Sequence, residues 1–326
     1  MKRTHILFLS ITIVILALIG AHFFETILAQ KHAQKMHAKA LLVKNNFSNI
    51  SYDARAVCIV GENGKIIYEK NGSVALPLAS MTKVMTAIIA AFTYTPTDTF
   101  FVDKNTWNFT DFDKALLGHT WSFESLLSGL LINSSNTAAD TLANITDTNR
   151  PGLGPETPSF VIRMNDKARE LGLGSFVYRN PSGLDIGQKT ERTPGAIGSA
   201  CDSAKLILEL QRSFPIYAAI STYPMAEFSP VDNPKIKALA TNTDPLTTER
   251  NGILASKTGT TTLAGGNLSL VYGTSGQTFG IVVMGAKDEN ARVIEMRKLL
   301  DNTDIFAVSL NEQGLTLSEY YKWLSQ

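Results

Sequence analysis

The chain has 326 residues, of which 44% are apolar and 18% are charged, and its formal net charge is +1. This composition suits one large or two small globular domains, and the near-neutral charge gives no reason to expect a nucleic-acid partner. The sequence has no Cys/His cluster with zinc-ligand spacing, so we expect neither a metal nor another cofactor. Cys58 and Cys201 lie far apart in the sequence; a pair between them is open, but we interpret them as buried free thiols.

The N-terminal segment predicts a membrane contact. Residues 1–5 are a short basic region on the cytoplasmic side, and an apolar run over residues 6–24 follows. At about 19 residues this run is long enough to cross a bilayer as a helix. It has no small-x-small cleavage site, which favours an uncleaved transmembrane anchor over a signal peptide. Residues 25–50 are lysine-rich and predict a basic stalk or helix.

Residues 51–326 predict one folded domain that begins with a β-hairpin. Two short apolar runs, residues 54–60 and 65–69, flank an Asn-Gly pair, which is a strong hairpin signal. From about residue 80 to about residue 245 the chain reads as helix and loop. Apolar spacing of three and four predicts helices over residues 123–132, 160–171 and 198–211, and Pro and Gly mark a loop over residues 146–158.

The last third of the chain reads as strands and a closing helix. Strand-like runs cover residues 253–260, 267–272 and 278–284, with turns expected at residues 265–266 and 274–276, and an amphipathic helix over residues 289–300. Strands at both ends imply an α/β fold of the α+β type. Its antiparallel sheet of about five strands is built from both chain ends and flanked by helices, with a mainly helical subdomain.

Ser80 and Lys83 form an S-x-x-K motif just before an apolar run. On a helix that opens at Ser80 the two side chains share a face, so Lys83 can act as general base for Ser80 as nucleophile. The helix N-terminus also favours a developing alkoxide. We expect burial and the nearby cation of Lys257 to lower the pKa of Lys83.

Ser134 and Asn136 form an S-x-N motif directly after the apolar stretch 123–132. Ser134 is placed to relay a proton between Lys83 and a leaving group, and Asn136 to donate to a substrate amide carbonyl. Ser135 has the wrong spacing for the relay. Taken alone, this motif is typical of a polar turn that ends a helix.

Lys257, Thr258, Gly259 and Thr260 end an apolar strand. Lys257 and the Thr258 hydroxyl can bind a substrate carboxylate, and Gly259 lets a substrate backbone approach the strand. The backbone N–H of Thr260 is the expected oxyanion donor. Taken alone, Lys257 is typical of a charge that protects an edge strand.

The three motifs S-x-x-K, S-x-N and K-T-G occur in the order typical of active-site serine enzymes that handle penicillin. A Ser-His-Asp mechanism would have to use His119, since the other four histidines lie in the N-terminal segment. We interpret His119 as a surface residue in a turn.

With these motifs the chain resembles the low-molecular-mass penicillin-binding proteins, the D-alanyl-D-alanine carboxypeptidases. The resemblance runs from about residue 54 to about residue 300 and includes residues 76–87, 164–168 and 180–185. It implies a β-lactamase/transpeptidase-like fold and a serine-type carboxypeptidase. Ser80 would be acylated by the penultimate D-alanine of a peptidoglycan stem peptide, and β-lactam antibiotics would be inhibitors. The domain would then lie outside the cytoplasm on a single-pass membrane anchor.

Two departures from that family pattern are visible. Thr137 and Ala138 follow the S-x-N motif where the family often has Asp-Ala, and no β-rich C-terminal domain or C-terminal anchor is expected. Other interpretations remain: a D,D-endopeptidase or transpeptidase of the same family, a class A-like β-lactamase, or a penicillin-binding sensor without activity. The β-lactamase reading lacks its deacylating glutamate, since no E-x-x-L-N follows Asn136.

Overall fold

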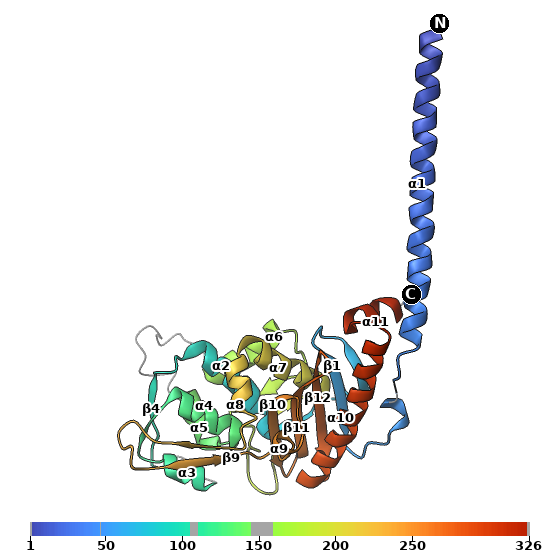
Figure 1. Ribbon diagram of the computed structural model, residues 1–326. Helices are drawn as coiled ribbons and strands as arrows, with labels where there is room; N and C mark the ends of the chain where they lie inside the picture. The colour runs from blue at the N-terminus through green and yellow to red at the C-terminus, as the bar shows by residue number, and fades with distance from the viewer. Residues whose placement is uncertain (1, 46, 105–109, 145–158, 325–326) are drawn as a thin grey trace. The chain divides into compact units, whose positions relative to one another are not determined.

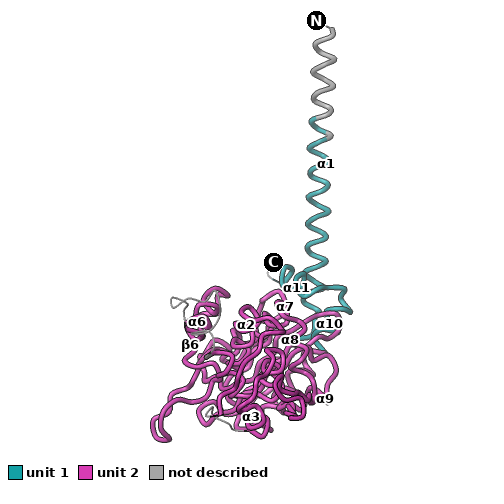
Figure 2. Tube along the Cα trace, turned by 90° about the vertical axis from the view of Figure 1, so that its left-hand side faces the viewer, with its two compact units in different colours: residues 1–45, 305–326 teal, residues 46–304 magenta. Residues whose placement is uncertain are grey.

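The computed structural model describes residues 2–45, 47–104, 110–144 and 159–324. The chain divides into two compact units, which are coloured separately in Figure 2. One consists of Met1–Asn45 with Ile305–Gln326, and the other is Asn46–Asp304. The loop expected over residues 146–158 lies outside the described residues.

The smaller unit is helical. It contains α1 (Lys2–Leu41), the end of α10 (Glu289–Glu312) and α11 (Leu317–Leu324). His37 Nδ1 donates to the carbonyl of Trp323 at 2.5 Å, and Lys39 Nζ donates to the carbonyl of Gln313 at 2.8 Å, so α1 is tied to the C-terminal segment. A search of the described part of the chain finds no helix with the length and apolarity of a membrane span.

The larger unit contains a five-stranded antiparallel sheet in the order β10-β11-β12-β1-β2 (Figure 1). Its strands are β1 (Ala56–Gly61), β2 (Ile66–Lys70), β10 (Ile253–Thr261), β11 (Gly265–Thr274) and β12 (Gln277–Ala286). The prediction of one antiparallel sheet made from both chain ends is therefore confirmed. The turn expected at residues 265–266 is wrong, because these glycines begin β11 and the turn lies at residues 262–264.

Helices cover both faces of this sheet. Side chains alternate along a strand, so Ala56, Cys58 and Val60 face one side and Val57 and Ile59 the other, and all are fully buried. On the first side α7 (Ala200–Ser213) packs against β1, β11 and β12. On the second side residues 289–304 of α10 bury a row of apolar side chains: Met296, Leu299 and Leu300.

The two cysteines form a disulfide, and the expectation of free thiols is wrong. Cys58 lies in β1 and Cys201 in the first turn of α7, and their Cα atoms are 5.1 Å apart. The packing of α7 on β1 brings together residues that are 143 positions apart in the sequence. Spacing alone carries no sign of this proximity.

The helical subdomain lies between β2 and β10 in the sequence. The predicted helices are observed as α4 (Phe123–Ile132), α6 (Phe160–Glu170) and α7. Each begins after a serine whose hydroxyl accepts from a backbone N–H of the first turn, namely Ser122, Ser159 and Ser199. The region is not helix and loop alone, because it also holds short strands: β3 (Leu76–Pro77), β4 (Thr99–Phe101), β5 (Thr120–Ser122), β6 (Val177–Tyr178), β7 (Ala196–Gly198), β8 (Met225–Phe228) and β9 (Ala238–Thr241).

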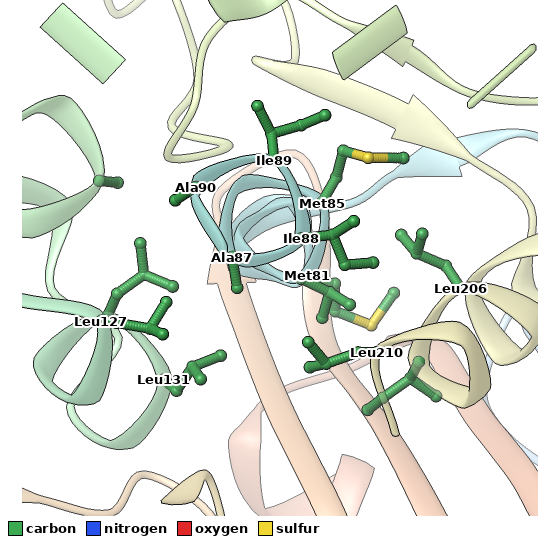
Figure 3. Close-up of a cluster of buried hydrophobic side chains, with 14 of the residues drawn as sticks. Met81, Met85, Ala87, Ile88, Ile89, Ala90, Leu127, Leu131, Leu206 and Leu210 are labelled. Carbon is green, nitrogen blue, oxygen red and sulfur yellow. The ribbon is translucent and has the colours of Figure 1, made fainter. Parts of the chain in front are cut away.

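Helix α2 (Lys83–Thr93) forms the centre of the core. Figure 3 shows its apolar side chains between α4 and α7, with Leu127 and Leu131 on one side and Leu206 and Leu210 on the other. Residues Val84 to Ala90 of α2 are all buried. Because apolar neighbours surround the helix, the residues at its N-terminus are held in a fixed position.

Candidate active site

Ser80 lies in a short 3₁₀ turn, η2 (Ala79–Thr82), which leads directly into α2. The α-helix therefore begins at Lys83 and not at Ser80, as we expected from the sequence. Ala79, the residue before the serine, has a φ of 50°, a left-handed conformation that costs of the order of 1 kcal/mol or more for a residue with a Cβ. Such strain next to a half-buried serine is typical of a functional site.

The η2 turn is fixed against the sheet at two points. The side-chain amide of Asn267, fully buried on β11, donates to the carbonyls of Pro77 (2.9 Å) and Leu78 (3.1 Å). A Cβ added at Gly259 on β10 would lie 2.9 Å from the backbone N of Ser80. Only glycine allows this approach, so the K-T-G strand and the amide of Ser80 border the same small space.

Lys83 is completely buried, and its ammonium group forms hydrogen bonds with three other residues of the site. Nζ donates to Ser80 Oγ at 2.8 Å, to Asn136 Oδ1 at 2.7 Å and to the carbonyl of Ser182 at 2.9 Å. Burial lowers the pKa of Lys83 to about 7, against a partial opposing effect of the carboxylates of Asp140 and Asp113. Burial is the main cause of this shift, and the repulsion between the two lysines appears in the lowered pKa of Lys257.

The S-x-N motif forms the turn between α4 and α5 (Asn136–Asn144). Ser134 has a φ of 63°, so it too is held in a left-handed conformation. Its hydroxyl accepts a hydrogen bond from Lys257 Nζ at 2.9 Å. The lysine that contacts Ser134 is therefore the one on the strand, and not Lys83. Because Asn136 Oδ1 is engaged by Lys83, its Nδ2 remains the group that can donate to a substrate.

Lys257 lies in the middle of β10 and is 1% exposed. Its Nζ donates to Ser134 Oγ and to the carbonyl of Thr258 at 3.0 Å. Burial, followed by the charges of Lys83 and Arg292, lowers the pKa of Lys257 well below its usual value. The site therefore contains two buried lysines, one at the start of a helix that donates to Ser80 and one on a strand that donates to Ser134.

Thr258 and Thr260 point to the other side of β10 from Lys257 and Gly259, as alternation requires. The Thr258 hydroxyl is 2.5 Å from that of Thr243, and the Thr260 hydroxyl accepts from Arg292 Nη1 at 2.7 Å. The side chain of Thr260 is exposed, which leaves its face of the strand open to a ligand.

Arg292 is a functional candidate that the sequence reasoning missed. Its side chain, on α10, is 4% exposed, and Nη2 also donates to the carbonyl of Thr243 at 3.2 Å. It brings a permanent positive charge to the end of the K-T-G strand, close to where a carboxylate would sit. The only sequence signal was a basic residue in a helix that follows three strands, which is common and not specific.

The segment 180–185, noted for its resemblance, forms one wall of the site. Gly183 comes so close to the nucleophile turn that an added Cβ would lie 1.9 Å from the carbonyl of Ala79. Asp185 accepts from the Thr261 hydroxyl at 3.0 Å and so links this wall to β10. His119 lies elsewhere, with Nδ1 3.4 Å from Asp232 Oδ1.

The profile of the D-alanyl-D-alanine carboxypeptidase family matches residues 43–288 of the chain. The chain belongs to this family. A D-alanyl-D-alanine carboxypeptidase of Bacillus subtilis is 30% identical over 264 residues, which cover 78% of this chain and 63% of that protein. A D-alanyl-D-alanine endopeptidase of Pseudomonas aeruginosa is 27% identical over 252 residues, which cover 75% of this chain and 76% of that protein.

The fold is also that of solved structures. The crystal structure of a D-alanyl-D-alanine carboxypeptidase from Mycobacterium tuberculosis matches with a TM-score of 0.63 and 25% identity, over 81% of this chain and 92% of that one. Among the sequence relatives, the chain spans 61–64% of the length of three carboxypeptidases that it matches. Membership of the family and its fold are therefore established for the part of the chain that aligns.

Proposed function

We propose that this chain is a serine-type D-Ala-D-Ala carboxypeptidase that cleaves peptidoglycan stem peptides through an acyl-enzyme on Ser80. The observation that carries the proposal is the 2.8 Å bond between Ser80 Oγ and Lys83 Nζ, in a site where the pKa of Lys83 is about 7. A lysine that is neutral for part of the time at physiological pH can take a proton from serine.

In the acylation step Ser80 Oγ attacks the penultimate D-alanine carbonyl and Lys83 takes the hydroxyl proton. The new C–O bond gives a tetrahedral oxyanion, and the backbone N–H groups of Ser80 and Thr260 stabilise it. The C–N bond then breaks, and the proton that Lys83 took passes through the hydroxyl of Ser134 to the amine of the leaving D-alanine, which returns Lys83 to its neutral form. The hydrogen bond from Lys257 Nζ to Ser134 Oγ supports this role, because it holds the hydroxyl in place for the transfer.

The terminal carboxylate of the substrate would be bound by residues on and beside β10. Lys257 and Thr258 lie on β10, and the buried guanidinium of Arg292 adds a charge that does not titrate. Asn136 Nδ2 is free to donate to a substrate amide carbonyl, since its Oδ1 is held by Lys83. Water then attacks the acyl-enzyme, and Ser80 is released with its proton.

The N-terminal segment completes the proposal. We place residues 6–24 in the membrane as a single-pass anchor, residues 25–50 as a stalk, and residues 51–326 outside the cytoplasm. The support is the apolar run in the sequence, and a substrate that exists only beyond the membrane. N-terminal sequencing of the mature protein from membrane fractions tests this, because a cleaved signal would give a new terminus between residues 21 and 30.

A second activity, D,D-endopeptidase, is kept because a relative that aligns over 76% of its own length carries that name. The two activities use the same acylation chemistry and differ in the amine that leaves. Digestion of purified cross-linked and uncross-linked muropeptides separates them. Release of free D-alanine supports a carboxypeptidase, whereas conversion of dimers to monomers supports an endopeptidase.

Penicillin labelling tests the chemistry itself. Mass spectrometry of the intact chain after incubation with benzylpenicillin should show one added drug mass, and Ser80→Ala should remove it. A long-lived adduct is expected, because the sequence has no deacylation glutamate of the β-lactamase kind. Rapid turnover of the drug without an adduct would contradict the proposal.

A further inference from the structure

A buried carboxylate, Asp113, lies behind the S-x-N turn. It belongs to α3 (Asp111–Leu116) and is fully buried. Its Oδ1 accepts a short hydrogen bond from the hydroxyl of Ser135, and Ser135 Oγ in turn accepts from the backbone N of Ala138 at 2.9 Å. The middle residue of the motif therefore starts α5 and ties it to α3. This explains how Ser134 is held in its left-handed conformation.

A second carboxylate lies on α5 itself. Asp140 is one helical turn after Asn136, and residues four apart share a face of a helix. That face is directed at α2, because Asn136 Oδ1 receives the bond from Lys83 Nζ, and α5 packs against both α2 and α3. Burial raises the pKa of Asp140 to about 6; the positive charge of Lys83 opposes this shift, and the negative charge of Asp113 adds to it.

The other elements that pack against α5 bring few charges to this place. The strand β4 has none, and the only charged residue of α4 is Glu124 in its exposed first turn. On α6, the Nη1 group of Arg163 donates to the hydroxyl of Thr93, and the other charged residues of this helix pair with each other, Lys167 with Glu170 and Arg169 with Asp166. On α3, Lys114 pairs in the same way with Asp111. Among the described residues, the carboxylates that act on the charge of Lys83 are therefore those of Asp140 and Asp113.

We propose that Asp140, with Asp113 behind it, is a positioning residue for the acylation reaction. Its negative charge favours the protonated form of Lys83, whose three N–H groups donate to Ser80, Asn136 and Ser182, and so sets the pH at which this lysine gives up its proton. The inference rests on the proposed role of Lys83 as base, and adds to it a group that does not touch the substrate.

The sign of the effect follows from the charges. A negative charge near Lys83 favours its protonated form, so its removal lowers the pKa of Lys83 further below about 7. The acid limb of the acylation rate should then move to lower pH, by about one unit. In the parent, Asp140 loses its own proton near pH 6, which makes Lys83 hold its proton more strongly as the pH rises. The acid limb of the parent should therefore be shallower than that of the variant.

The experiment measures the second-order rate of acylation by benzylpenicillin for the full chain, from about pH 5 to about pH 9. The variants are Asp140→Asn and the conservative Asp140→Glu. The control is Asp166→Asn, an exposed carboxylate on α6 that pairs with Arg169. Asp140→Asn should shift and steepen the acid limb, Asp140→Glu should restore most of the parent profile, and Asp166→Asn should leave it unchanged.

Two failures are distinguishable. If the parent chain is acylated at Ser80 and folded Asp140→Asn shows the parent profile, the positioning role is wrong and the proposed function stands. If the parent chain is not acylated at Ser80, the proposed function fails first. Should Asp140→Asn unfold, the same profile is measured on Asp140→Glu, whose longer side chain moves the carboxylate. An unchanged profile in that variant, at unchanged thermal stability, also overturns the proposal.

Discussion

The helical half and the sheet half of the candidate site are held in place by different means. In the helical half, Ala79 and Ser134 have φ values of 50° and 63°, and side-chain bonds keep them there. In the sheet half, Lys257, Thr258 and Gly259 pair in regular register with Ser269, Leu268 and Asn267 of β11. The backbone ladder alone defines those positions. Substitutions in the helical half should therefore change the backbone conformation of the site. Substitutions in the sheet half should change the side-chain charge while the backbone stays in place.

The largest effect is expected from loss of the helical lysine. Lys83→Met keeps the length of the side chain but removes the base, and acylation by penicillin should slow by about 10³-fold or more. His119→Ala, at the surface near Asp232, is the control and should label at nearly the parent rate. Stopped-flow or gel-based labelling gives both rates. Normal labelling of a folded Lys83→Met variant would rule out the proposed base.

The disulfide joins the two halves, so its removal tests whether they depend on each other. Cys58 lies in the sheet and Cys201 in a helix, 143 residues apart. The double change Cys58→Ser with Cys201→Ser should lower the free energy of unfolding by about 3–4 kcal/mol, because the unfolded chain is no longer constrained. Urea denaturation under oxidising conditions measures this. A loss below about 1 kcal/mol would mean that packing of α7 on β1 suffices.

The two buried lysines predict a stability that depends on pH. In both, the folded pKa is lowered, for Lys83 to about 7, so between the folded pKa and the ordinary lysine pKa the unfolded chain binds protons that the folded chain does not. The free energy of unfolding should therefore rise with pH, up to the ordinary lysine pKa, by about 1.4 kcal/mol per pH unit for each lysine. Lys257→Met should make the free energy of unfolding rise less steeply with pH, because only Lys83 then contributes to the slope. An identical slope between about pH 7 and pH 9 in parent and variant would contradict the prediction.

The smallest effect is expected from an alanine-to-glycine substitution, made once in each half of the site. Ala79→Gly should raise the free energy of unfolding by about 0.5–1 kcal/mol, because glycine accepts a positive φ without strain. Ala255→Gly, at a buried position of β10, should lower it by about 1 kcal/mol or more, since a strand gains nothing from that freedom. Thermal unfolding of the two variants gives the signs. Equal signs would mean that Ala79 is not strained.

The sequence predicted the parts of this molecule that depend on local pattern. The helix over residues 123–132 was predicted to the residue, because its apolar residues recur at a spacing of three and four. The five-stranded sheet followed from β-branched runs at both ends of the chain. Strands of two or three residues, such as β3 and β7, are too short to show a period, and they were missed.

Proximity between distant segments could not be predicted. Nothing in the spacing of Cys58 and Cys201 indicates that α7 lies on β1. Arg292 and Asp140 are ordinary charged residues of helices, and only the packing of these helices brings them to the site. The motif residues were found because their chemistry repeats in a known order, whereas their supporting residues have no such pattern.

The order of the sheet also has a consequence for how the chain folds during its synthesis. β1 lies between β2 and β12, so a growing chain that has emerged as far as residue 250 holds Ser80 and Lys83 but lacks three of the five strands. Neither Lys257 nor the Thr260 amide yet exists to face the serine. We therefore expect the growing chain to be unreactive until its last strands close the sheet. Any truncation within β10 to β12 should abolish fold and reactivity together, so that no partly made product can be trapped by a drug.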